Sequence, residues 1–224
     1  MILNTSMKKS LKGIVLLGLI LFFGYLVYLN YLIKEAFSTE IQDSKNITQI
    51  ESTLETYPTE MVNMILLVED QSFFQHRGVD FKEILRVFYG YLFEDKKIRG
   101  ASTITQQLIK NTLLSNDKTL SRKIDEALMA ILMELNYDKN YILERYMNTV
   151  YLAQQGSVAV HGFAGASNFY FGKNVQDLDL REMATLVALL KGPSYYHPVK
   201  HPDRLNMRVD MILSMHNKYK KIIQ

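Results

Sequence analysis

Residues 179–193 read DLREMATLVALLKGP, and this stretch carries the start, the apolar face and the stop of one buried helix. Asp179 and Glu182 form a capping box, in which each side chain satisfies a free backbone N–H group at the helix start. The apolar positions recur at spacings of three or four, as on one face of a helix: Met183, Leu186, Val187 and Leu190. Gly192 and Pro193 then end the helix, because glycine suits the turn that follows a helix and proline cannot continue it.

The same helical spacing recurs on both sides of this stretch. In residues 81–93 and 121–135 the recurring apolar positions are Ile84, Leu85, Phe88, Leu92, Ile124, Leu128, Ile131 and Leu135. Another helix is expected to begin near Pro202, because proline suits a first helical turn. An alternating β pattern is limited to a short hairpin expected at residues 154–160. The sequence therefore predicts a mainly α fold.

The predicted helix at residues 81–93, FKEILRVFYGYLF, is apolar on more than one face. A helix on the surface of a soluble protein is about half polar, so this one needs a different environment. Either the centre of a protein core or the surface of a membrane would satisfy it, and the pattern alone leaves both open.

An uncharged stretch near the N-terminus predicts a transmembrane helix. Residues 13–33, GIVLLGLILFFGYLVYLNYLI, are long enough as a helix to cross a hydrocarbon core about 30 Å thick. The stretch exceeds the apolar region of a secretory signal peptide, and no small-residue cleavage site follows it. The preceding lysines, Lys8, Lys9 and Lys12, predict a cytoplasmic N-terminus with the remaining chain outside. A buried helix of a soluble protein is the alternative.

The composition and the lack of internal repeats limit the remaining chain to one domain. We divide the 224 residues into a cytoplasmic tail at 1–12, the transmembrane helix at 13–33, a polar stem at 34–57 and one folded domain at 58–224. A net charge of only +3 does not indicate a nucleic-acid partner. The absence of cysteine excludes disulfides, zinc-thiolate sites and thiol nucleophiles, and we expect no organic cofactor.

Glu69 and Asp70 are the first candidates for chemistry, because they directly follow the apolar run MILLV. A carboxylate at the end of an apolar segment is easily desolvated, which raises its affinity for a proton and suits a general base. The alternative for these two residues alone is an ordinary acid at a helix end.

Residues 100–111, GASTITQQLIKN, predict a second helix start with a polar face. Thr103 and Gln106 can form a capping box, and Thr103, Gln107 and Lys110 share one face of the helix that follows. Hydroxyl, amide and ammonium groups beside free backbone N–H groups suit a phosphate or a sugar. A solvated helix face is the alternative.

Arg122 and Glu126 lie one helical turn apart in residues 121–134, SRKIDEALMAILME. At this spacing they could form a surface ion pair that stabilises the helix by only about 0.2–0.5 kcal/mol. The functional alternative places Glu126 beside a bound pyrophosphate, where it would orient arginine and lysine side chains.

Taken together, these segments resemble five ordered signatures of family 51 glycosyltransferases. Residues 69–80, EDQSFFQHRGVD, match every fixed position of the first signature, E-D-x-x-F-x-x-H-x-G-x-D. Residues 100–111 resemble the second signature, and RKIDE at 122–126 resembles the third, R-K-x-x-E. Residues 145–173 and 184–198 resemble the fourth and fifth, so the resemblance covers nearly the whole predicted extracytoplasmic part.

The resemblance implies a mostly helical, lysozyme-like glycosyltransferase domain with a membrane-touching jaw. Members of this family polymerise lipid II: the 4-hydroxyl of an acceptor attacks C1 of the growing chain, and undecaprenyl pyrophosphate leaves. An α-linked donor becomes a β-1,4 glycan, so one inverting displacement suffices and no covalent nucleophile is needed.

The resemblance also assigns roles to individual residues. Glu69 matches the general base, and Glu126 matches a second glutamate near the leaving pyrophosphate. The positions matched to substrate binding are Arg86, Ser102, Thr103, Gln106, Gln107, Lys110, Lys118, Arg122, Lys123, Lys191 and Arg208. Lys118 stands where arginine is common, which replaces a planar guanidinium by a point charge. A magnesium or manganese ion at Glu126 is compatible with these roles, although no spacing in the sequence demands one.

The expected partners are lipid II and the growing glycan chain, membrane lipids and other cell-wall synthesis proteins. The expected location is the cytoplasmic membrane, crossed once, with the glycosyltransferase domain outside. The chain ends soon after the fifth signature, so we expect a monofunctional transglycosylase or the glycosyltransferase domain of a class A penicillin-binding protein. The alternatives are a lysozyme-like lytic hydrolase, against which the cations of the signatures argue, and a non-catalytic cell-wall assembly factor.

Overall fold

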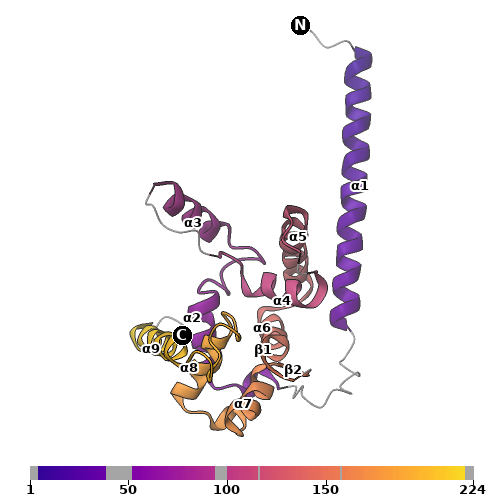
Figure 1. Ribbon diagram of the computed structural model, residues 1–224. Helices are drawn as coiled ribbons and strands as arrows, with labels where there is room; N and C mark the ends of the chain where they lie inside the picture. The colour runs from indigo at the N-terminus through magenta and orange to yellow at the C-terminus, as the bar shows by residue number, and fades with distance from the viewer. Residues whose placement is uncertain (1–4, 39–51, 94–99, 116, 157, 220–224) are drawn as a thin grey trace.

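The computed structural model (Figure 1) is mainly α, with one two-stranded hairpin beside the helices. It describes residues 5–38, 52–93, 100–115, 117–156 and 158–219. The helices are α1 (Thr5–Ser38), α2 (Thr59–Glu69), α3 (Phe81–Phe93), α4 (Ile104–Leu113), α5 (Leu120–Asn136), α6 (Lys139–Thr149), α7 (Phe163–Phe171), α8 (Leu180–Leu189) and α9 (Pro202–Tyr219), with 3₁₀ turns η1 (Leu54–Thr56) and η2 (Val175–Asp177). The hairpin pairs β1 (Tyr151–Gln155) with β2 (Val158–His161) in antiparallel orientation. The predicted mainly α class and the predicted hairpin are both confirmed.

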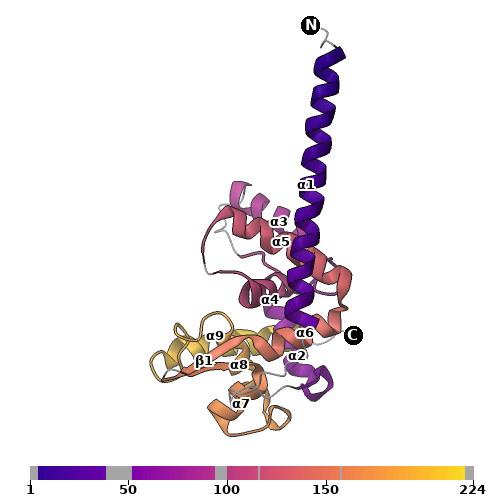
Figure 2. The ribbon, with the colours of Figure 1, turned by 90° about the vertical axis from the view of Figure 1, so that its right-hand side faces the viewer.

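Helix α1 extends far beyond the rest of the molecule, as Figures 1 and 2 show from two sides. The helix runs over Thr5–Ser38, and its part Ser10–Ser38 is long and apolar enough to cross a membrane. The predicted span at residues 13–33 lies within it, and the helix continues into the predicted stem. Residues 1–4 of the predicted tail and 39–51 of the predicted stem lie outside the described residues.

The last third of α1 packs against the domain, whereas residues 10–25 are exposed. Its buried side chains lie one helical turn apart: Leu29, Ile33 and Phe37. The Tyr25 hydroxyl donates a hydrogen bond to Asp125 Oδ1 of α5 at 2.7 Å. Farther along, Asn136 Nδ2 donates to Asn30 Oδ1 at 2.7 Å. The helix that would cross the membrane is therefore also fastened to α5.

Helix α8 lies in the core, where it packs against α2 and α9. Leu186 and Val187 on its predicted apolar face are fully buried. The predicted capping box is confirmed, since Glu182 N–H donates to Asp179 Oδ1 at 2.8 Å and Asp179 N–H donates to Glu182 Oε2 at 2.9 Å. Helix α9 begins at Pro202, as its sequence predicts.

Helix α3 is not part of the core. Gly90 is its one buried residue, and its large apolar side chains are exposed: Phe81, Ile84, Leu85, Phe88, Tyr89, Tyr91, Leu92 and Phe93. Figure 1 shows α3 reaching out from the domain on the side toward which α1 extends. Of the two environments that its sequence left open, the structure excludes the protein core.

Helix α5 buries a different face from the one that its apolar spacing indicates. Its buried residues are Glu126, Met129, Ala130 and Met133. In the apolar row read from the sequence, Ile124 is 51% exposed and Leu135 is 69% exposed. Because α5 carries apolar residues on two sides, contact with neighbouring helices decides which side is covered.

Candidate active site

A cavity of about 280 Å³ lies where the end of α2 meets the loop before α4. Its walls also include the start of α3 and Met215 of α9. The predicted site residues in its lining are Glu69, Arg86, Ser102 and Thr103. The fold thus brings residues of the first and second signatures to one space.

Glu69 is the last residue of α2 and is half-buried at this cavity. Its Oε2 accepts a hydrogen bond from Gln107 Nε2 at 3.0 Å. Gln107 Oε1 in turn accepts a hydrogen bond from the hydroxyl of the buried Tyr146 at 3.1 Å. Both ends of the Gln107 amide therefore bind protein groups, and one of them holds the Glu69 carboxylate.

Asp70 joins the end of α2 to the start of α4. This buried carboxylate accepts the backbone N–H of Ile104 at 2.9 Å and the ring N–H of His76 at 3.0 Å. The first turn of a helix has free N–H groups and favours a negative charge, so the contact of Asp70 with the Ile104 N–H is electrostatically stabilised. Asp70 and His76 thus hold the loop after Glu69 against α4.

Thr103 and Gln106 form the capping box predicted for α4. Gln106 N–H donates to Thr103 Oγ1, and Thr103 N–H donates to Gln106 Oε1, both at 3.1 Å. The Thr103 hydroxyl also donates to the Gly78 carbonyl at 2.6 Å. Each of the two side chains is only 2% exposed. The structure therefore gives both predicted substrate ligands a structural role, because the Thr103 hydroxyl and the Gln106 amide oxygen bind within the protein.

Glu126 is 1% exposed, so its pairing with Arg122 is not the surface ion pair that the spacing allowed. Arg122 Nη1 donates to Glu126 Oε2 at 2.8 Å, and Lys123 Nζ binds the other carboxylate oxygen. Lys123 Nζ also donates to Ser102 Oγ at 2.9 Å. Arg122, Lys123 and Glu126 do not line the cavity themselves, but Ser102 does, so Lys123 connects this cationic cluster around Glu126 to the wall of the space that holds Glu69.

Arg86 and Lys110 are two further predicted cations, and they lie on α3 and α4. Arg86 lines the cavity and donates two hydrogen bonds of 2.7 Å to Glu83. Lys110 is exposed on α4, three residues after Gln107 and on the same face, but it does not line the cavity itself.

Three further predicted cations lie outside the lining of the cavity. Lys118 is exposed before α5, and Lys191 is exposed just after α8. Arg208 Nε donates to the Ala188 carbonyl at 3.2 Å, and its guanidinium lies 5.3 Å from the centre of the Tyr196 ring. Arg208 therefore ties α9 to α8, and its contact with substrate stays a prediction.

Two acids at the cavity, Asp80 and Glu83, were not among the predicted site residues. Asp80 accepts the Glu83 N–H at 2.9 Å, which caps α3, and it also binds the Ser72 hydroxyl. Burial acts to raise the pKa of Asp80, but these hydrogen bonds hold it below its ordinary value. Asp80 is the last fixed position of the first signature, so the pattern marked it. Met215 reaches the cavity by tertiary packing, and no sequence signal marked it.

The metal expected at Glu126 finds no matching set of ligands. The part of the chain that the structure describes contains no group of three or more His, Cys, Asp or Glu side chains that could hold a metal ion. Both carboxylate oxygens of Glu126 already bind cations, from Arg122 and Lys123. Glu126 therefore offers a metal no oxygen that is not already bound, and the magnesium or manganese ion at this residue remains a prediction.

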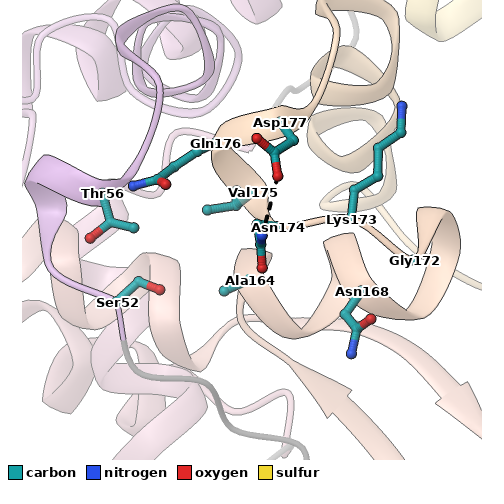
Figure 3. A pocket seen from close by; sticks show the side chains of 10 residues that line it. All are labelled: Ser52, Thr56, Ala164, Asn168, Gly172, Lys173, Asn174, Val175, Gln176 and Asp177. Carbon is teal, nitrogen blue, oxygen red and sulfur yellow. Dashed lines mark hydrogen bonds between the residues drawn. The ribbon is translucent and has the colours of Figure 1, made fainter.

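Two larger cavities lack a carboxylate beside a cationic cluster. Figure 3 shows one of about 440 Å³, with Ser52 and Thr56 on one side and the segment around η2 on the other. Of its charged residues, Lys173 donates a hydrogen bond to Glu182, and Asp177 accepts one from Asn174. The other cavity, of about 580 Å³, lies between β1, α7 and the segment after α8. Neither contains a predicted site residue, so lining chemistry and not volume selects the cavity at Glu69.

Comparison with known proteins gives matches over the same part of the chain. The model of a family described as Transglycosylase matches residues 34–217. Penicillin-binding protein 1B of Vibrio cholerae is 44% identical over 159 residues, which are 71% of this chain and 20% of that protein. Penicillin-binding protein 1B of Haemophilus influenzae is 38% identical over 179 residues, 80% of this chain and 23% of that protein. Penicillin-binding protein 1F of Bacillus subtilis is 42% identical over 160 residues, 71% of this chain and 22% of that protein. The chain thus spans about a fifth of the length of these curated relatives.

Proposed function

Because this chain belongs to the transglycosylase family, we propose that it is a peptidoglycan glycosyltransferase that polymerises lipid II into β-1,4 glycan strands. The observation that carries the proposal is that Glu69, held by Gln107, lines a cavity whose Ser102 is bound by Lys123 of the cationic cluster around Glu126. Glu69 suits removal of a proton, and the cationic cluster suits a departing diphosphate.

Glu69 is the proposed general base. The acceptor 4-hydroxyl is a poor acid, so its proton must leave as the new C–O bond forms, toward a group at hydrogen-bond distance. Gln107 binds one oxygen of Glu69 and so restricts the rotation of the carboxylate. The other oxygen can then receive the proton while the hydroxyl attacks C1 of the donor.

The cationic cluster is the proposed stabiliser of the leaving group. Negative charge grows on undecaprenyl pyrophosphate as the bond to C1 breaks, and preorganised cations in a partly dry site stabilise such charge strongly. Glu126 holds Arg122 and Lys123 in place without neutralising both, because two positive charges surround one buried negative charge. Lys110, exposed on the same face of α4 as Gln107, adds a further cation to this region.

Helices α1 and α3 are the proposed contacts with the membrane. The lysines before the span favour a cytoplasmic N-terminus, which would put the domain outside with its lipid-linked substrate. The exposed apolar side chains of α3 reach out on the side toward which α1 extends, so the two helices can enter one bilayer together. This arrangement would present the cavity to a lipid II molecule that stays in the membrane.

The direct test is incubation of the purified full chain with labelled lipid II, with and without a chelator. We expect glycan polymer and released undecaprenyl pyrophosphate. Release of short anhydro or reducing sugars from finished glycan, with no polymer made, would support a lytic hydrolase instead. Absence of any turnover on either substrate would support a non-catalytic assembly factor. Loss of polymer on chelation alone would establish the metal requirement.

Two truncations of α1 separate membrane attachment from docking on the domain. Removing residues 1–24 leaves the docked part of α1 in place, so activity should fall more on bilayer-embedded lipid II than on detergent-solubilised lipid II. Removing residues 1–38 also strips Leu29, Ile33 and Phe37 from the core. Burial of each such side chain contributes about 1.5–3 kcal/mol, so this variant should also unfold at a lower temperature. If removal of residues 1–24 lowers activity equally on both forms of lipid II, a positioning role for the anchor is contradicted.

A further inference from the structure

Three helices meet in a chain of hydrogen bonds that ends on Glu69. Tyr146 of α6 is 1% exposed, and its hydroxyl donates to Gln107 Oε1 of α4 at 3.1 Å. Gln107 Nε2 donates to Glu69 Oε2 of α2 at 3.0 Å. Tyr146 itself belongs to neither the lining of the cavity nor the set of residues predicted to bind substrate.

The Tyr146 hydroxyl determines which way the Gln107 amide faces. Burial, with a smaller effect of the nearby Glu69 and Asp70 carboxylates, raises the pKa of Tyr146 well above its ordinary value. The hydroxyl therefore keeps its proton and needs an acceptor, which the amide oxygen supplies. The amide NH₂ group must then face Glu69. If the amide were reversed, its carbonyl oxygen would face the carboxylate without a proton between them.

The direction of this amide matters for a general base. An N–H donor that faces the carboxylate can bind one of its oxygens, whereas a carbonyl oxygen in the same place cannot. This hydrogen bond fixes the orientation of the carboxylate, and a reacting group must lie within about 3–3.5 Å of its target in the right geometry. Among the described residues Gln107 is the one side chain bonded to Glu69, so this orientation depends on it.

We propose that Tyr146 is a positioning residue for the reaction: through Gln107 it holds Glu69 in the orientation that receives the acceptor proton. The proposal rests on the proposed function. It gives Gln107 a second role beside the predicted contact with substrate, and it extends the site to a side chain on α6 that substrate need not touch.

The chain contains a matched control for this hydrogen bond. The Tyr57 hydroxyl donates to Asn148 Oδ1 at 2.7 Å, and Tyr57 is 4% exposed. This is the same pairing of a buried tyrosine with a side-chain amide oxygen, and no residue of the cavity takes part in it. Tyr57→Phe should therefore have a structural effect like that of Tyr146→Phe, without the effect on catalysis.

The experiment measures steady-state polymerisation of lipid II and thermal unfolding for the full chain and its variants. Tyr146→Phe should lower kcat about tenfold and leave KM within about twofold, because the interaction is with the base and not with the substrate. Tyr57→Phe should keep kcat at the unsubstituted value. Gln107→Met, which breaks the same chain at its partly exposed middle, should lower kcat at least as much. The double variant Gln107→Met with Tyr146→Phe should have nearly the same kcat as Gln107→Met alone.

Several results would overturn the proposal. One is an unchanged kcat in folded Tyr146→Phe, and another is an equal loss of kcat in Tyr57→Phe. A change confined to KM would also exclude it, because that result indicates substrate binding. If Tyr146→Phe fails to fold, the kcat of Gln107→Met decides in its place. If the unsubstituted chain is active and the variants are unaffected, only the role of Tyr146 is refuted. If the unsubstituted chain itself is inactive, the proposed function fails together with the role of Tyr146.

Discussion

Glu69→Gln is expected to lower the rate of lipid II polymerisation by at least about 100-fold, within the range that general-base catalysis contributes. The amide has nearly the same shape as the carboxylate but cannot accept the proton of the acceptor hydroxyl. Its carbonyl oxygen can still accept the hydrogen bond that Gln107 donates to Glu69 Oε2. The fold and the cationic cluster should therefore persist, and donor binding should remain.

Two measurements on Glu69→Gln separate chemistry from binding: the polymerisation rate and the affinity for a lipid-linked donor. Glu60→Gln is the matched control, because Glu60 is an exposed acid in the first turn of the same helix. It should leave both quantities unchanged. Turnover of Glu69→Gln close to that of the unsubstituted chain would remove Glu69 from the role of base. A rate loss that follows a loss of donor affinity would assign Glu69 to binding.

Elements with strong local signals were predictable from the sequence. Helix α8 has both a capping box and a glycine-proline stop, and the structure forms its cap as predicted. Pro202 begins α9, and the span of α3 coincides with the predicted residues 81–93. Caps, proline positions and apolar spacing act within one or two helical turns, so they can be read before tertiary contacts are known.

The faces that helices cover were less predictable. Both α3 and α5 show helical apolar spacing, yet α3 is exposed along its length and α5 leaves Leu135 exposed. Spacing identifies a helix but not its partner. In α5 the partners are α1 and α4, which approach from different sides, and only the folded chain shows which apolar row each of them covers.

The site was predictable in its residues and less so in its contacts. The signatures marked Glu69, Glu126 and Lys123, but the hydrogen bond from Lys123 to Ser102 joins positions 21 residues apart. The contact of Tyr146 with Gln107 joins positions 39 residues apart. Such contacts depend on how helices cross, which no local pattern in one sequence records.

Gly78→Ala is expected to lower the free energy of unfolding by about 2 to 6 kcal/mol, the sum of backbone strain and overpacking. Gly78 has a backbone φ of +83°, which residues with a side chain rarely adopt. A Cβ atom placed on it would lie 2.4 Å from the backbone oxygen of Ala130 in α5. A backbone neighbour cannot rotate away as a side chain can, so the loop would have to move off α5. Thermal or denaturant unfolding measures the change.

Gly172→Ala provides the control that separates strain from contact. Gly172 has a similar φ of +63°, but a Cβ atom there would meet no heavy atom within 4 Å. Its substitution should cost only about 1 to 2 kcal/mol of strain. Equal losses in the two variants would show that α5 does not constrain the loop.

Gly78 also lies in the loop after Glu69 and is packed against α5, the helix that carries the cluster around Glu126. Its substitution therefore has a second expected effect. Its carbonyl accepts the Thr103 hydroxyl, and its loop connects Glu69 with the cap of α3 at Asp80. A loop displaced from α5 would move these groups relative to the cluster around Glu126. Gly78→Ala should therefore lose polymerisation activity even at temperatures where it remains folded, whereas folded Gly172→Ala should keep it. A folded and fully active Gly78→Ala would mean that the relative position of Glu69 and the cluster around Glu126 does not depend on this contact.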